Sequence, residues 1–326
     1  MVKKINRFMN FVRWPEFGAL LGFLSIFLLF SIISTNFLSL VNFSAVFTVA
    51  AELGIISIGI NYLVISGEFD LSVGAIFAVT PMVLALLVNT GISPYIAFII
   101  SLFCALLIGF LNGLITLRAR IPSFVTTLGM MMFWRGILLA VSKGFPISYS
   151  SNNKVLLNIL NSRVLFSGMG VRMSSFWYLI IAVIFSIILV RTRYGNWVFA
   201  TGGSKEVAKA MGINIERVKM INFLISSLLA GFAGCVSLAR FNIVDPTLGS
   251  GLELEALSAV VIGGTFLSGG YGSIIGTFIG ALLIGMVRSG LVLAGAPAYW
   301  YTAFIGIILI ISVAINAKIR SMVLGE

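Results

Sequence analysis

The sequence predicts an all-α integral membrane protein with about ten transmembrane helices arranged as two pseudo-repeated halves. Of its 326 residues, 60% are hydrophobic and 10% are charged, and the mean hydropathy is +1.13. Soluble domains carry roughly 25% charged residues. A chain of this length could not bury so much apolar surface and still cover itself with charge. The composition therefore excludes a soluble enzyme, a disordered chain and a nucleic-acid-binding module.

The gaps between charged residues predict the individual spans. Residues 17–51 are free of charge, and residues 71–117 are long enough for two helices of roughly 20 residues each, with a turn of Asn, Gly, Ser and Pro between them. The expected spans are 17–35, 44–65, 71–88, 94–117, 123–142, 174–190, 220–239, 254–268, 272–293 and 299–316. The eighth span is the shortest, which makes it a candidate for a re-entrant segment or a half-helix.

The distribution of basic residues predicts that both termini lie in the cytoplasm. With the N-terminus inside, the inner segments hold 14 Lys and Arg and the outer segments hold 5. Lys and Arg concentrate on the cytoplasmic side of membrane proteins. Four of the inner basic residues lie in residues 1–14. We expect a single transmembrane domain over 1–326, with its long inner connection at 191–219 and its longest outer connection at 143–173.

The residues usually needed for metal binding, redox chemistry and nucleotide hydrolysis are missing or unsuitably placed in this sequence. There is no histidine, and the two cysteines, Cys104 and Cys235, lie in apolar runs. We therefore expect no metal, no cofactor and no redox site. The phosphate-binding motif G-x-x-x-x-G-K-[ST] is absent, so we expect the chain not to be an enzyme and any ATP to be hydrolysed by another polypeptide.

Two glycine-containing segments, 64–74 and 260–272, interrupt the apolar helices and resemble each other. Both have a Val-Ile pair followed by Gly, Leu-Ser and Gly. Paired, Gly-interrupted segments in the two halves of a transporter point to a central binding region. For residues 64–74 the alternative is a short polar turn in which Asp70 caps the third span, and composition alone favours this alternative. For the repeat of the two segments, the alternative is chance similarity.

The inner connection contains a predicted short helix. Ser204 is suited to cap its start, and Gly212 to end it. Val207, Ala208 and Met211 should share one face. A solvated connecting helix is the plain interpretation, but a two-turn amphipathic helix is also suited to a groove on a partner protein.

Glu52, Arg135 and Arg288 are among the charged residues that fall inside predicted spans. Glu52 and Arg135 lie at similar depths, about 10–12 Å from the outer end at 1.5 Å per residue, which permits an ion pair. The alternative for both Arg135 and Arg288 is a side chain that extends to the outer interface; we expect this for Arg288, and both possibilities stay open for Arg135.

Four stretches of the sequence resemble the permease subunits of bacterial ABC importers for monosaccharides of the ribose, xylose and galactose type. They are 67–74 with its D-L-S-V-G, 119–129 with its R-I-P-x-F-x-x-T-L-G, the connection 191–212, and 259–270. The resemblance covers nearly the whole chain. It implies a permease in the bacterial inner membrane that forms the path for a monosaccharide and is driven by separate ATPase subunits. Permeases for nucleosides or branched-chain amino acids, and an ion-coupled secondary transporter, remain alternatives.

The resemblance also implies partners. They are a second permease copy or a similar permease, cytoplasmic ATP-binding subunits, an extracytoplasmic sugar-binding protein and membrane lipid, with no nucleic acid. Ser204 stands where the family usually has Asn, and another polar cap can serve there. Glu68 stands where the family commonly has a small aliphatic residue, which points to a different ligand.

Two groups of site residues follow from these expectations. Sugars offer hydroxyls and no charge, so their path needs scattered hydrogen-bonding groups, which we place between the second, third and eighth spans. The expected path residues are Asp70, Ser72, Gly74, Gly263, Gly264 and Ser268. The residues expected to couple the chain to an ATPase are Gly203, Ser204, Lys205, Ala208, Met211 and Gly212.

Overall fold

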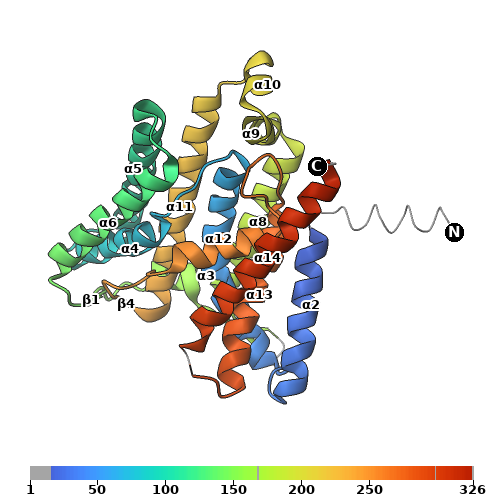
Figure 1. Cartoon of the computed structure of the whole chain (residues 1–326). Coiled ribbons are helices and arrows are strands. Elements are labelled where there is room, and N and C mark those ends of the chain that lie inside the picture. Colours follow the sequence, from blue (N-terminus) through green and yellow to red (C-terminus); the bar gives the residue numbers. More distant parts are fainter. Residues whose placement is uncertain (1–15, 167–168, 298, 325–326) are drawn as a thin grey trace.

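The computed structural model describes residues 16–166, 169–297 and 299–324, and it is mostly helical (Figure 1). The basic residues of the N-terminal segment 1–14 lie outside the described residues. The long helices are α2 (Glu16–Ile33), α3 (Leu40–Ile65), α4 (Val73–Asn89), α5 (Pro94–Ala119), α6 (Ser123–Ser142), α8 (Met173–Arg191), α11 (Ile215–Phe241), α13 (Ile274–Leu293) and α14 (Trp300–Leu324).

Polar residues at the helix starts explain several of these boundaries. The side chains of Ser39, Asn214 and Ser273 accept hydrogen bonds from backbone N–H groups in the first turns of α3, α11 and α13. These N–H groups have no partner within their own helix, so a side-chain oxygen there stabilises the helix start. Pro94 begins α5, where a missing N–H costs nothing.

The structure contains helices that can cross a membrane, as the sequence predicts. Among the described residues, six helices are long and apolar enough to cross a membrane: α3, α5, α6, α8, α11 and α13. Three shorter apolar helical stretches, Gly18–Ile33, Val73–Asn89 and Trp300–Ala314, correspond to the expected first, third and tenth spans.

The eighth expected span, 254–268, is wrong in its extent. The helix there, α12 (Leu252–Ile262), has 11 residues and is about 16 Å long, whereas a hydrocarbon core is roughly 30 Å thick. The chain leaves the helix at Gly263 and Gly264, and Gly264 has a φ of +88°, which favours glycine. Residues 264–273 then connect to α13 without regular structure.

Helices α3 and α11 form the interior of the protein. In the most apolar 18-residue stretch of each, 72% of the residues are buried, compared with 17% in α6 and 28% in α8. Helix α3 packs against α8, α11, α12 and α13, while α11 also packs against α4 and α5. The exposed apolar side chains of α5, α6 and α8 suit contact with lipid, whereas α3 and α11 are suited to hold an internal site.

Both long connections contain structure of their own. The connection 143–173 holds β1 (Ile147–Ser148), α7 (Val155–Asn161) and the antiparallel hairpin of β2 (Arg163–Phe166) and β3 (Met169–Arg172). Strand β1 pairs with β4 (Ile243–Val244) from the segment after α11. The connection 191–219 holds α9 (Arg193–Gly203), α10 (Lys205–Ala210) and the first residues of α11. Figure 1 shows α9 and α10 at the end of the assembly opposite β1 and β4.

Candidate functional site

Asp70 lies at the centre of a buried polar network between α3 and α4. Its side chain is 2% exposed. One carboxylate oxygen accepts hydrogen bonds from the Ser72 backbone N–H (2.9 Å) and hydroxyl (2.6 Å), and the other accepts from the Ser226 hydroxyl of α11 (3.3 Å). The Asn112 amide of α5 donates to the Ser72 hydroxyl at 2.7 Å. All of these donors are neutral, so the network joins the start of α4 to two other helices without an ion pair.

The expected capping role of Asp70 is wrong in detail. The residue at the cap of α4 is Ser72, whose side chain makes no capping hydrogen bond. Asp70 instead accepts from the N–H two residues further on, which is the geometry of an Asx turn. The flanking N–H groups of Phe69 and Leu71 donate to the hydroxyls of Ser123 and Thr127 on α6. The turn is therefore held from both sides by side chains of neighbouring helices.

The second glycine segment packs against the first through backbone contacts. The Gly270 N–H donates to the Ile65 carbonyl at the end of α3 (2.8 Å). Gly202, at the end of α9, lies so close to this junction that a Cβ atom there would clash with the Ile65 carbonyl. Gly67 and Gly269 are also adjacent, since a Cβ on Gly269 would come within 3.1 Å of the Gly67 Cα. The two glycine segments that interrupt the helices, 64–74 and 260–272, therefore contact each other, and the end of α9 in the inner connection lies against the same junction.

The remaining expected path residues differ in their surroundings. Gly74 and Gly263 are buried, and Gly263 lies against the backbone of Gly276 and Thr277 on α13. Gly264 is also buried, whereas Ser268 is exposed. The structure therefore brings the two segments together at Gly67 and Gly269, while Asp70 and Ser72 face α5 and α11.

The predicted short helix of the inner connection is present. The Ser204 side chain caps α10 by accepting from the Val207 N–H (3.3 Å), and Gly212, just after the helix, has a φ of +74°. Hydrogen bonds from the backbone N–H of Glu206 and from the Ser204 hydroxyl lower the pKa of the Glu206 carboxyl. Gly203 and Lys205 are exposed at the start of the helix.

The side chains expected on one face of α10 separate into two groups. Val207 is 56% exposed and Met211 is 70% exposed, so both are open to a partner. Ala208 is fully buried inside the chain, and it is not free to contact another protein. The expectation that Ala208 is a contact residue is therefore corrected: Ala208 faces the chain's own interior, because a short helix lying on the protein surface must turn one side inward.

The charged residues inside the spans have partners that the sequence did not indicate. Glu52 of α3 pairs with Arg240 of α11 at 3.3 Å, and not with Arg135, the partner that their similar depths permit. Arg135 instead donates to the carbonyls of Leu248 (2.6 Å) and Gly74 (3.0 Å). Arg288 does not simply extend to the interface, because it pairs with Glu255 of α12 at 3.2 Å.

Glu68 also has a structural partner. Its carboxylate forms a largely buried ion pair with Lys219 near the start of α11, in which the Lys219 side chain is 4% and that of Glu68 14% exposed. Removing one partner of such a pair leaves an uncompensated buried charge. The unusual acid at this position is thus explained by a contact within the chain, and it needs no special ligand.

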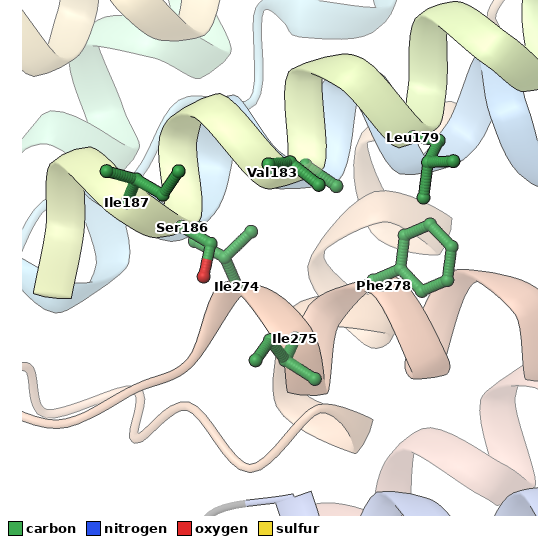
Figure 2. Close-up of a pocket in the computed structure, with 8 residues that line it drawn as sticks. Leu179, Val183, Ser186, Ile187, Ile274, Ile275 and Phe278 are labelled. Carbon is green, nitrogen blue, oxygen red and sulfur yellow. The ribbon is translucent and has the colours of Figure 1, made fainter.

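Two hollows of very different chemistry lie between the helices. A groove of about 240 Å³ between α8 and α13 is lined by apolar side chains with Ser186 among them, as Figure 2 shows. A cavity of about 340 Å³ among α3, α4, α11, α12 and α13 is lined by two of the three ion pairs described above, Glu52 with Arg240 and Glu255 with Arg288. Sequence reasoning did not find this cavity. The signal for it in the sequence is the charge of Glu52, Glu255 and Arg288 inside expected spans.

The fold and these sites define a multi-pass helical membrane protein with polar elements in its interior. Residues 42–313 match the model of a protein family described as the permease component of the branched-chain amino acid transport system. The ribose import permease protein of Bacillus subtilis is 32% identical to this chain, over 93% of each chain. The autoinducer 2 import system permease protein of Photorhabdus luminescens is 29% identical over 94% of this chain and 90% of the relative.

A probable ABC transporter permease protein of Escherichia coli is 34% identical over 92% of this chain and 89% of the relative. The chain belongs to this family and is a permease subunit of a bacterial ABC importer, located in the inner membrane. It is not itself an enzyme. Membership of the family implies separate ATPase and substrate-binding partners.

Proposed function

We propose that the chain forms the membrane path for a monosaccharide. The observation that carries this proposal is similarity along nearly the whole chain to ribose import permeases, at 32% identity to the one from Bacillus subtilis. The description of the family names branched-chain amino acids, but the similar relatives are import permeases named for ribose and for autoinducer 2, which favours a monosaccharide. Similarity to import permeases, including a probable ABC transporter permease, favours an ATP-driven mechanism over an ion-coupled one.

The substrate class is tested by uptake in cells that express the chain with its partner proteins. We expect uptake of labelled ribose or another monosaccharide, and competition by unlabelled monosaccharides. Leucine and adenosine are expected not to compete. Uptake of leucine or adenosine in place of any monosaccharide would contradict the proposal.

The proposed topology has ten membrane segments, with α12 and residues 263–273 together making the eighth, and has both termini in the cytoplasm. The basic residues around α9 and α10 support this orientation. A cysteine introduced at Asn152, in the connection that holds β1, is expected to react with an impermeant thiol reagent from outside. A cysteine at Lys205 is expected to react only in inverted vesicles. The reverse labelling pattern would exclude this orientation.

We place the substrate path between α3, α4 and α12, next to Asp70, Ser72, Gly74, Gly263, Gly264 and Ser268. Breaks in helices leave backbone groups free to line a polar path. The contact between Gly67 and Gly269 supports the placement, because it joins the two breaks. In this conformation most of these groups are buried, so the path must open by moving α4 or α12 away from its neighbours.

The segment from Gly202 to Gly212 is proposed to dock on the ATPase, with Val207 and Met211 as its apolar contacts. Their exposure on a short capped helix supports this role. The close packing of Gly202 against Ile65 offers a direct route from the ATPase to the junction of the two broken segments. The assembly is proposed to contain two copies of this chain, or this chain and a similar permease.

A further inference from the structure

The cavity lined by Glu52, Arg240, Glu255 and Arg288, called the four-charge cavity below, has the size and position of a ligand site. Its volume of about 340 Å³ falls within the roughly 300–1,000 Å³ typical of small-molecule sites. It lies among α3, α4 and α12, the helices between which we place the path, and residues of α11 and α13 also line it. Ionisable residues within membrane-spanning helices are costly and commonly mark substrate pathways.

Each ion pair keeps unused hydrogen-bonding capacity. Glu52 and Arg240 share one contact at 3.3 Å, and a single nitrogen of Arg288 donates to both oxygens of Glu255, at 3.2 and 3.3 Å. A guanidinium carries five N–H donors and a carboxylate has about four acceptor positions. The cavity can therefore offer donors and acceptors side by side while both pairs remain intact. Hydroxyl groups, which donate and accept, match this arrangement.

Aromatic rings hold both arginines in place. The Arg240 guanidinium lies over the Phe241 ring, 4.8 Å from its centroid, and that of Arg288 lies over the Tyr301 ring at 4.3 Å. The Tyr301 hydroxyl also donates to Glu255 at 2.7 Å. Phe77 and Phe241 contribute ring surface to the cavity wall. Fixed donors beside apolar ring surface suit a ligand with both polar edges and C–H faces.

We propose that the four-charge cavity binds the transported substrate, a neutral polyhydroxylated molecule of monosaccharide size. Two acids and two arginines give the cavity no net charge, so a neutral ligand enters without leaving any charge uncompensated. This inference rests on the proposed function and adds the location of the binding site to it.

Protection of a cysteine tests the site in the complete complex of chain, ATPase and binding protein in membranes. Ser250→Cys, on the cavity wall, is made in a background with Cys104→Ser and Cys235→Ala and is modified with a thiol reagent. Ribose at about ten times its dissociation constant for the cavity is expected to slow modification of the Ser250→Cys variant about tenfold, because only transporters with an empty cavity react. Asn152→Cys, which is exposed outside the cavity, serves as the control and is expected to react at the same rate with and without ribose.

A second pair of variants links the site to transport. Glu52→Gln combined with Arg240→Gln removes both charges together, so no buried charge is left unpaired, and ribose uptake is expected to fall at least tenfold with normal membrane insertion. Val183→Phe, which fills the apolar groove of Figure 2 instead, is expected to leave uptake unchanged.

The outcomes separate this inference from the proposed function. If the unmodified complex transports no monosaccharide, the proposed function fails. If it transports ribose but Ser250→Cys is not protected and the Glu52→Gln, Arg240→Gln variant transports normally, the cavity is not the site. Protection by leucine and not by ribose would overturn the assignment of a polyhydroxylated ligand.

Discussion

Asp70→Ala is expected to reduce substrate uptake by the assembled transporter at least tenfold. The substitution removes the acceptor of the Ser72 N–H, the Ser72 hydroxyl and the Ser226 hydroxyl, all in a buried site. An unsatisfied buried donor costs about 1–3 kcal/mol. Because this network fixes the start of α4 to α11, its loss should displace α4 from the path. The measurement is the initial rate of ribose uptake, normalised to the amount of chain in the membrane.

Asp70→Asn distinguishes structural support from a role for the charge. The Asn oxygen can still accept from Ser72, and its NH₂ group can donate to the Ser226 hydroxyl, so the turn before α4 should persist. We expect near-normal uptake if the carboxylate acts through this turn. A large loss with Asn at normal insertion would assign a role to the charge. Normal uptake by Asp70→Ala would show that neither the turn held by Asp70 nor its charge is needed for transport, and it would overturn our placement of the path at the start of α4.

The second large effect is expected from Val207→Asp combined with Met211→Asp. These substitutions place two charges on the exposed apolar side of α10, where a groove on the ATPase would have to desolvate them. We expect ATP hydrolysis by the complex no longer to respond to the loaded binding protein, and uptake to fall to background. Membrane insertion should be normal, because both side chains are already exposed. The measurement compares ATP hydrolysis with and without loaded binding protein.

A matched control variant accompanies this test. Val155→Asp, on α7 in the connection 143–173, is a matched substitution of a similarly exposed valine and should leave coupling unchanged. Ala208→Glu is a poor test of docking, because Ala208 is buried against the chain itself and the change should disturb α10 locally. Stimulated hydrolysis that persists in the Val207→Asp, Met211→Asp variant would exclude α10 as the contact with the ATPase.

The helices of this protein could largely be predicted from the sequence because each local signal acts over a few residues. Ser204 and Gly212 bound α10 as expected, and Pro94 begins α5. The short eighth segment is predicted from the sequence, but the end of α12 at Ile262 is not, because residues 264–268 carry no charge and contain Phe266 and Leu267.

The partners of the charged residues could not be predicted because they are set by packing between distant helices. Glu52 and Arg240 are 188 positions apart, and Glu68 and Lys219 are 151 apart. Depth along a helix suggested Arg135 for Glu52, but depth does not say which side of a helix faces which neighbour. The inward orientation of Ala208 was missed for the same reason, because spacing along a helix defines a face without saying what covers it.

The most direct test of the account is ATP-driven uptake by purified components in proteoliposomes. The chain, its ATPase and its binding protein are reconstituted together and with each component omitted in turn, and ribose inside the vesicles is measured with ATP supplied on the ATPase side. Ribose is expected to accumulate inside the vesicles against its gradient only when all components and hydrolysable ATP are present. Accumulation by this chain alone, driven by an ion gradient without ATP, would contradict the account.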